Sequence, residues 1–351
     1  MTYKYNIFFI CALMLSIIAC SNDDDDTPVS VPENDRTEQQ VVDNDSLVNY
    51  LNTHYYNATE VNAIANPTVA DVVITELLDG ETLPSGTSLL MSAVETKTTT
   101  YLDVEYDYYI LKIKQGSGAT SPRFCDKVRV NYSGYLMDGT KFDGSSLPVN
   151  FDLVSLIPGW SRVMPQFNTA NSYVSNSDGT VSFDGYGMGV MFLPSGLGYY
   201  ATFRVSIPSY SNLIFKFELM QTQTADHDFD NIPTYIEAIE GDLNLYNKDL
   251  DGDLLADFID TDDDGDGMLT SDEVRVETYT EDSRSLLETT LNALELESNQ
   301  FLSPIKFQPN QKEQQSDPNF RNSEFGLPAA CKAETMRPDD RTCNKIAKNR
   351  A

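Results

Sequence analysis

The sequence contains few basic residues, few histidines and few cysteines for its 351 residues. Its 24 Lys and Arg stand against 54 Asp and Glu, which gives a formal net charge of −30. A surface of that sign repels phosphate backbones, so we expect no nucleic-acid partner. Two histidines and five cysteines are too few for zinc clusters or for a disulfide-dense scaffold. No apolar run approaches the roughly 20 residues that a membrane-spanning helix needs.

The start of the chain has the pattern of an export signal. Lys4 precedes an apolar stretch over residues 7–19, which is too short to span a bilayer. The stretch ends in Ile17-Ile18-Ala19-Cys20, which resembles the lipobox of bacterial lipoproteins. This resemblance implies a lipid on Cys20 and membrane attachment through that anchor. The alternative is an ordinary secretory signal with a chance cysteine.

An acidic run, Asp23 to Asp26, follows the proposed lipid cysteine. It resembles the export signal of some Gram-negative surface lipoproteins, which implies a protein anchored at the outer membrane and exposed on the cell surface. The same run also fits a solvated linker, and the two interpretations are compatible. The sequence leaves the oligomeric state open.

Cysteine use is consistent with export. Removal of residues 1–19 removes Cys11, and the lipid occupies Cys20, so Cys125, Cys331 and Cys343 remain. An odd number in an oxidising compartment leaves at least one free thiol. Cys331 and Cys343 can pair, whereas Cys125 is predicted to be a buried small apolar residue.

Composition changes several times along the chain. Hydrophobic residues make up 40% and aromatic residues 11%, enough for a folded core. A helix is predicted over 45–57, and the strand-type residues concentrate in 105–222. We expect, in order, a lipoprotein signal peptide at 1–19, an acidic tether at 20–42, a small N-terminal region at 43–104, a strand-rich domain at 105–222, a linker at 223–248, an Asp-rich segment at 249–273, an amphipathic helical segment at 274–302 and a disordered tail at 303–351.

The first segment that carries chemistry is 128–143. Its pattern predicts a strand, a hairpin turn at Asp138-Gly139 and a second strand ending in Phe142-Asp143. It resembles the V-x-V-x-Y-x-G-x-L-x-D-G-x-x-F-D pattern of the FKBP family of peptidyl-prolyl cis-trans isomerases. Three further pieces follow in the family's order, at 156–160, 193–199 and 207–219. The resemblance covers about a third of the chain, roughly 105–222.

The resemblance implies an α+β fold, in which a twisted antiparallel sheet wraps a short helix near Trp160. The small N-terminal region and the Asp-rich segment flank this domain. It also implies isomerisation of X-Pro bonds in Pro-containing polypeptides, with no cofactor for catalysis. Rotation about such a bond breaks amide resonance against a barrier of about 18–20 kcal/mol. The twisted transition state has less charge separation than the planar amide, so a dry aromatic pocket favours it.

Carried over position by position, the family's pocket falls on nine residues. The aromatic side chains form walls, Ile157 offers its backbone N–H, Tyr199 its hydroxyl, and Asp143 orients its neighbours. The catalytic candidates are Tyr132, Phe142, Asp143, Ile157, Trp160, Tyr199 and Phe215, and the substrate-binding candidates are Leu156 and Ile207.

The sequence departs from the family pattern in three places, which bear on rate and substrate preference. Val149 stands where an aromatic residue is usual, Tyr200 replaces a glycine, and a polar insertion occupies 168–185. Retention of Asp143 and Tyr199 favours an active isomerase. Val149 and Tyr200 favour a non-catalytic module that grips a Pro-containing ligand on a calcium-stiffened stalk. Nutrient or glycan capture, a third class, has no dedicated motif.

The second segment that carries chemistry is 249–273, in which 11 of 25 residues are acidic and none is basic. Its second half fits D-x-[DN]-x-[DN]-G-x5-E, a calcium-loop pattern. No apolar helix precedes it, so the tandem spacing resembles thrombospondin type 3 repeats rather than an EF-hand pair. Leu254 stands where glycine is expected, which predicts a weaker first site; a solvated acidic run is the alternative. The candidate ligands of structural Ca²⁺ are Asp249, Asp251, Asp253, Asp257, Asp260, Asp262, Asp264, Asp266, Met268 and Glu273.

Overall fold

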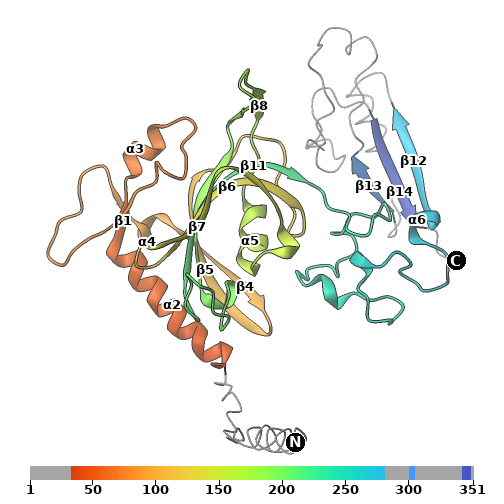
Figure 1. Cartoon of the computed structure of the whole chain (residues 1–351), viewed down its shortest axis with the longest axis horizontal. Coiled ribbons are helices and arrows are strands. Elements are labelled where there is room, and N and C mark those ends of the chain that lie inside the picture. The colour runs from red at the N-terminus through yellow and green to blue at the C-terminus, as the bar shows by residue number, and fades with distance from the viewer. Residues whose placement is uncertain (1–32, 281–299, 305–341, 349–351) are drawn as a thin grey trace, which may run out of the picture. The chain divides into compact units, whose positions relative to one another are not determined.

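The computed structural model describes residues 33–280, 300–304 and 342–348 (Figure 1). The chain divides into two units, Met1–Asn34 and Asp35–Ala351, and every element below belongs to the second. Within the described residues, no helix has both the length and the apolar character needed to cross a bilayer. The predicted signal peptide, the lipidation site Cys20, the run Asp23 to Asp26 and Cys331 lie outside the described residues.

A six-stranded antiparallel sheet organises the predicted FKBP-like region. Its strand order is β4-β5-β10-β11-β6-β7. The predicted hairpin turn at Asp138-Gly139 joins β6 to β7, and Gly139 takes the left-handed conformation at φ 83° that the turn requires. The strand bounds are β4 Glu95–Tyr101, β5 Val104–Lys114, β6 Lys127–Leu136, β7 Lys141–Asp152, β10 Gly187–Leu193 and β11 Leu213–Gln223.

Both faces of this sheet are covered, which explains why every residue of β10 is buried. Successive side chains of a strand point to opposite faces. Met191 and Leu193 therefore join the core around Trp160, whereas Val190 and Phe192 join a second core on the other face.

The first face packs on the short helix α5, Pro158–Val163, as predicted for the segment around Trp160. Proline at the start of α5 supplies a helical φ and no N–H that would need a partner. A Cβ on Gly159 would lie 2.3 Å from a Leu193 methyl, so only glycine allows this close approach of helix and sheet. The 3-10 helices η1, Leu153–Ser155, and η2, Met164–Gln166, flank α5.

The second face packs on helix α2, Arg36–Thr53, on the side of the sheet away from α5 (Figure 1). Leu47 and Leu51 of α2 are fully buried against it. The remaining elements of this N-terminal layer are β1 His54–Tyr56, α3 Ala58–Ala63, β2 Ile74–Glu76, β3 Ser88–Leu89 and α4 Leu90–Ala93.

The predicted helix over 45–57 is present, but its bounds were wrong. It begins at Arg36 because the Asp35 carboxylate accepts hydrogen bonds from two N–H groups of the first turn, at 2.9 and 3.1 Å. It ends before His54 because β1 pairs with β2 and β3. Residues 36–42 thus belong to the helix and not to a tether.

The polar insertion at 168–185 forms a hairpin of its own. Strand β8, Ser172–Ser175, pairs with β9, Val181–Asp184. Asp178 caps the turn by accepting hydrogen bonds from the backbone N–H and the hydroxyl of Thr180, at 2.9 and 2.7 Å. The insertion therefore extends the structure without breaking the main sheet.

The acidic segment after β11 packs on the domain through a small core. Cys125 is buried, as predicted, against Leu245, Ala256 and Phe258. Residues 223–248, expected to form a linker, instead carry buried side chains, among them Ile232, Thr234 and Leu245. The regular elements here are η4 Leu245–Asn247, η5 Asp257–Ile259 and α6 Thr270–Glu273.

The predictions for the C-terminal part need two corrections. Residues 274–280, expected in a helical segment, form strand β12, Val274–Thr280, because their β-branched residues alternate as in a strand. Residues 342–348, expected in a disordered tail, form β14, Thr342–Lys348, which pairs with β12 and with β13, Gln300–Pro304. Residues 281–299 of the segment expected to be helical lie outside the described residues.

Candidate active site

A pocket of about 590 Å³ opens beside the start of α5, on the face of the sheet that carries Trp160. Six of the nine residues predicted for the isomerase site line it. Four further lining residues belong to η1 and to the loop after Tyr199. The lining consists of Phe142, Asp143, Ser155, Leu156, Ile157, Tyr199, Arg204, Val205, Ser206 and Ile207.

The other three predicted residues, Tyr132, Trp160 and Phe215, are buried and support the lining rather than belong to it. Trp160 packs edge-on against Phe215 with ring centroids 5.3 Å apart, and Tyr132 packs edge-on against Trp160 at 5.9 Å. Phe215 in turn contacts the lining residue Phe142 at 5.4 Å and an interplanar angle of 89°. Edge-to-face pairs of this kind fix the rings relative to one another.

The polar part of the site depends on one short hydrogen bond. The Tyr132 hydroxyl donates to Oδ2 of Asp143 at 2.8 Å, and the N–H of Gly144 donates to Oδ1 at 2.7 Å. Burial, and then the bond to Asp143, raise the pKa of Tyr132 above its ordinary value, so its hydroxyl stays protonated as a donor. The carboxylate of Asp143 is thus fixed at the edge of an aromatic pocket.

Gly134 explains one position of the family pattern that the sequence alone did not. It lies between the two aromatic residues Phe142 and Phe215, and a Cβ there would lie 2.6 Å from the Phe142 ring and 2.9 Å from the Phe215 ring. Glycine is therefore required so that Phe142 can reach the pocket.

Tyr200, which replaces a glycine of the family, keeps a left-handed backbone at φ 50°. This conformation is unfavourable for a non-glycine residue by about 1–2 kcal/mol. The loop holds it in place, because Tyr200 donates its N–H to Ser195 O at 2.9 Å and accepts from the N–H of Tyr210 at 2.7 Å. The Arg36 guanidinium lies 3.9 Å from its ring centroid. These contacts hold Tyr200 in the turn after Tyr199.

Sequence reasoning missed two contributors to the site. The Arg204 guanidinium lies 5.1 Å from the Tyr199 ring, and Arg204 and Ile207 exchange two backbone hydrogen bonds of 3.0 Å. Nothing in the family pattern marks this loop position. Phe151 contacts Tyr132 at 5.1 Å and Trp160 at 5.6 Å. Phe151 supplies an aromatic ring two residues after Val149. Because side chains two residues apart in a strand point to the same face, the sequence could have indicated this role for Phe151.

The two predicted calcium loops bring part of their ligand sets together. In the first loop the carboxylates of Asp249, Asp251 and Asp253 have oxygens within 4.8 Å of one another, and the same holds in the second for the residues at positions 1, 3 and 5, Asp262, Asp264 and Asp266. The buried carboxylates Asp257, Asp260 and Glu273 do not belong to these groups, and the Met268 side chain is exposed.

The two loops have the same backbone conformation at position 6 of the calcium-loop pattern. Leu254 at φ 80° and Gly267 at φ 91° occupy the same position, and each donates its N–H to the first Asp of its loop at 3.0 Å. The left-handed conformation destabilises a leucine by about 1–2 kcal/mol, whereas a glycine adopts it without this strain. The first loop thus carries backbone strain that the second does not, and the weaker first site stays a prediction.

Comparison with known proteins finds partial similarity to two families. Residues 118–173 match the family model described as FKBP-type peptidyl-prolyl cis-trans isomerase, and residues 227–294 match a model described as BamM C-terminal. FkpA from Aeromonas hydrophila, an FKBP-type isomerase, is 34% identical over 34% of this chain and 39% of that protein. The FKBP-type 22 kDa isomerase of Escherichia coli is 31% identical over 31% of this chain and 47% of that protein.

Two further comparisons cover similar shares of the chain. FK506-binding protein 1 of Saccharomyces cerevisiae is 28% identical over 34% of this chain and 95% of that protein. The crystal structure of FkpA from Escherichia coli matches 38% of this chain and 55% of that chain with 26% identity and a TM-score of 0.29. The chain thus spans less than half the length of the first two relatives. The hairpin and the residues 128–143 that form it lie within the part of the chain that resembles FKBP-type peptidyl-prolyl cis-trans isomerases.

Proposed function

We propose that this chain catalyses cis-trans isomerisation of X-Pro bonds in polypeptides. The observation that carries the proposal is the pocket itself, in which the fixed carboxylate of Asp143 adjoins Tyr199, Ile157 and the Phe142 ring. These residues come from three separate parts of the chain and face one cavity. The chemistry needs neither a nucleophile nor a metal.

The pocket acts by replacing water around the reacting amide. A planar amide is stabilised by charge separation between its nitrogen and oxygen, which a polar solvent favours. Apolar surroundings remove that stabilisation of the planar amide. The free energy of the twisted transition state therefore falls relative to that of the ground state. The backbone N–H of Ile157 and the Tyr199 hydroxyl are available to hold the carbonyls that flank the proline. Asp143, positioned by Tyr132, orients the pocket's polar edge.

The cellular setting is part of the proposal. The lipobox resemblance at residues 17–20 and the following acidic run support a lipoprotein anchored through Cys20 at the outer membrane of a Gram-negative bacterium, facing the cell surface. There the isomerase would assist folding of exported or surface proteins. Replacement of Cys20 by Ala tests the anchor, because the variant should leave the membrane fraction or fail to be processed; unchanged partition contradicts it.

Structural Ca²⁺ in the loops 249–260 and 262–273 is likewise proposed. Groups of three carboxylates with closely spaced oxygens support it, since hard cations prefer six to eight oxygen ligands. The loops contain none of the pocket residues, so calcium should stabilise the C-terminal part without changing catalysis. Calorimetry at millimolar calcium tests this; no binding heat in wild type, or equal affinity in Glu273→Gln, contradicts it.

A non-catalytic binding module is the second candidate. Val205 on the pocket rim is 97% exposed and its neighbour Phe203 is 68% exposed, which gives the rim an apolar surface suited to holding a ligand. Refolding of a protein limited by one slow X-Pro bond separates the two functions. An isomerase accelerates the slow phase at substoichiometric amounts. A module that only binds leaves the rate unchanged or lowers it in proportion to the amount added.

A further inference from the structure

Residues 226–237 repeat the acidic spacing of the predicted calcium loops. Asp226, Asp228, Asp230 and Glu237 stand at positions 1, 3, 5 and 12, as in 262–273. The segment lies within residues 223–248, which were expected to form a linker, and Asn231 occupies position 6, where the pattern has glycine. Asn231 nevertheless takes the left-handed conformation at φ 78°, which asparagine tolerates better than most residues.

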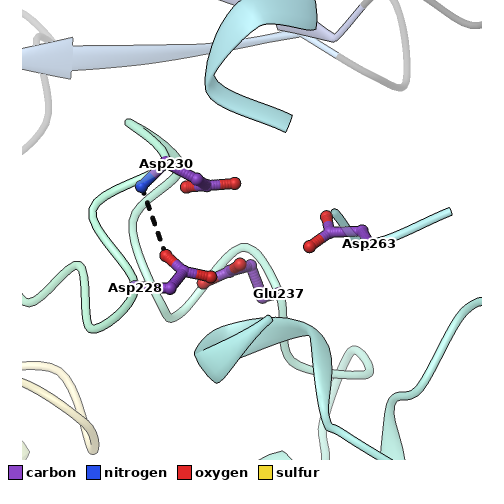
Figure 2. Close-up of side chains that lie close together, drawn as sticks. All are labelled: Asp228, Asp230, Glu237 and Asp263. Atoms are coloured by element: carbon purple, nitrogen blue, oxygen red, sulfur yellow. Dashed lines mark hydrogen bonds between the residues drawn. The ribbon is translucent and has the colours of Figure 1, made fainter. Parts of the chain in front are cut away.

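Four carboxylates converge where this segment meets the second loop (Figure 2). Oxygens of Asp228, Asp230, Glu237 and Asp263 lie within 4.8 Å of one another. Asp263 is at position 2 of the loop 262–273, so its side chain joins this cluster and not that loop's own group. Glu237 and Asp230 are 1% exposed and Asp263 is 4% exposed. We call these four residues the buried carboxylate cluster.

Glu237 indicates that the cluster has a ligand. Both of its carboxylate oxygens are buried and accept no hydrogen bond within the described part of the chain. The nearby base Lys248 forms its ion pair with Asp257 instead, at 3.2 Å. An ionised carboxylate without a partner is among the costliest groups to bury, and buried charges are paired or coordinate metals. A bound cation supplies the missing partner.

The donor set selects the kind of cation. All four side chains offer only oxygen. His227, the histidine nearest in sequence, has its ring nitrogens 2.7 Å from the Thr234 hydroxyl and 3.1 Å from the Asp152 carboxylate. Oxygen-only sites with several carboxylates suit Ca²⁺, whose ligands lie at about 2.3–2.6 Å. Ligands on opposite sides of such an ion are then about 5 Å apart, comparable with the spacing in the cluster.

We propose that the buried carboxylate cluster is a third Ca²⁺ site, separate from the two loops at 249–273. The spacing of the segment offers the main-chain carbonyl of Ile232, at position 7, as a further ligand. Because its residues come from two loops, the ion joins 226–237 to 262–273. The bond from His227 to Asp152 connects the first of these to the end of β7, so calcium here strengthens the attachment of the acidic segment to the isomerase domain.

The experiment counts calcium ions on the purified full chain by native mass spectrometry and measures thermal unfolding with and without calcium. Glu237→Gln should bind one ion fewer than wild type, whatever the loops at 249–273 contribute, and lose part of the calcium-induced rise in unfolding temperature. In chelator, this variant should be as stable as wild type or more so, because it removes a buried carboxyl group that has no hydrogen-bond partner in the described part of the chain. Glu240→Gln, three residues along and exposed, is the matched control and should keep every ion.

Equal calcium counts and equal calcium-induced shifts for wild type and Glu237→Gln would overturn the proposal. Asp228→Asn, at a less buried member of the cluster, provides an independent variant if Glu237→Gln fails to fold. It should also lose one ion, and an unchanged count in that variant would likewise overturn the site. Glu273→Gln reports on the second loop separately, so a failure of the predicted loops is distinguishable from a failure of the third site.

Discussion

The Asp43 carboxylate in helix α2 accepts two hydrogen bonds from Ser195, one from the backbone N–H at 2.8 Å and one from the hydroxyl at 2.6 Å. The backbone carbonyl of Asp43 accepts a third from the Asn212 side chain at 3.0 Å. Ser195 begins η3, Ser195–Leu197, and Asn212 immediately precedes β11. One residue of the N-terminal layer therefore holds both ends of the loop that carries Tyr199, Arg204 and the pocket rim.

Asp43→Asn tests this link. The variant keeps one side-chain acceptor and loses the other together with the charge, which should cost about 1–3 kcal/mol of unfolding free energy. Isomerase activity should fall as well, because the rim loop is less well fixed. Urea unfolding and peptide isomerisation measure the two effects. Asp45→Asn, exposed on the same helix, should change neither, and equal behaviour of the two variants contradicts the link.

Tyr132→Phe removes the donor to Asp143 while the ring stays in the aromatic cluster. We expect kcat/KM to fall about tenfold, equivalent to about 1.4 kcal/mol, because the carboxylate loses its fixed position. Stability should fall by no more than about 1.5 kcal/mol. Tyr173→Phe in the β8-β9 hairpin is the control. A Tyr132→Phe enzyme with wild-type kcat/KM would show that this bond does not position Asp143.

Gly134→Ala tests the packing behind Phe142. The added methyl group meets both flanking rings, so we expect a loss of about 1–3 kcal/mol in stability and a displaced Phe142. Activity should fall more than with Gly139→Ala, because nothing lies within 4 Å of a Cβ at that turn, although its positive φ adds local strain. Wild-type stability and activity in Gly134→Ala would contradict the close approach.

Asp126 should make the stability of the folded protein depend on pH in a predictable direction. It is 3% exposed and accepts from the N–H groups of Arg123 at 2.8 Å and Ala225 at 3.3 Å. Burial raises its pKa from 3.8 to about 6. The folded state therefore holds the Asp126 proton more tightly than the unfolded state does. The stabilisation that results is fully present below about pH 4 and is lost as the pH rises through about 6.

The measurement compares Asp126→Asn with wild type by chemical unfolding in chelator between pH 4 and 7. The neutral side chain removes the titration, so the stability of the variant relative to wild type should rise with pH by an amount on the order of 2–3 kcal/mol. A stability difference that stays constant over this range would show that Asp126 has an ordinary pKa in the folded protein.

The hairpin was predicted because residues 128–143 keep a typical spacing around one turn. The pocket positions followed from the resemblance of this segment and of three further pieces, at 156–160, 193–199 and 207–219, to one family pattern. The sequence could not predict that Trp160 and Phe215 support the lining, since burial depends on how distant strands pack. The start of α2 was missed because one cap, Asp35, extends a helix through residues of weak periodicity. The segment 226–237 was missed because Asn231 replaces the glycine that marks such loops, although both residues tolerate the required backbone.

The central claim is that the pocket itself turns X-Pro bonds. The most direct measurement is the cis-trans exchange rate of a short X-Pro peptide by NMR, with catalytic amounts of wild type, Tyr132→Phe or Tyr199→Phe. The account predicts faster exchange with wild type, a reduced effect with each variant, and near-native unfolding curves for both. An exchange rate with wild type equal to that of the peptide alone would contradict it.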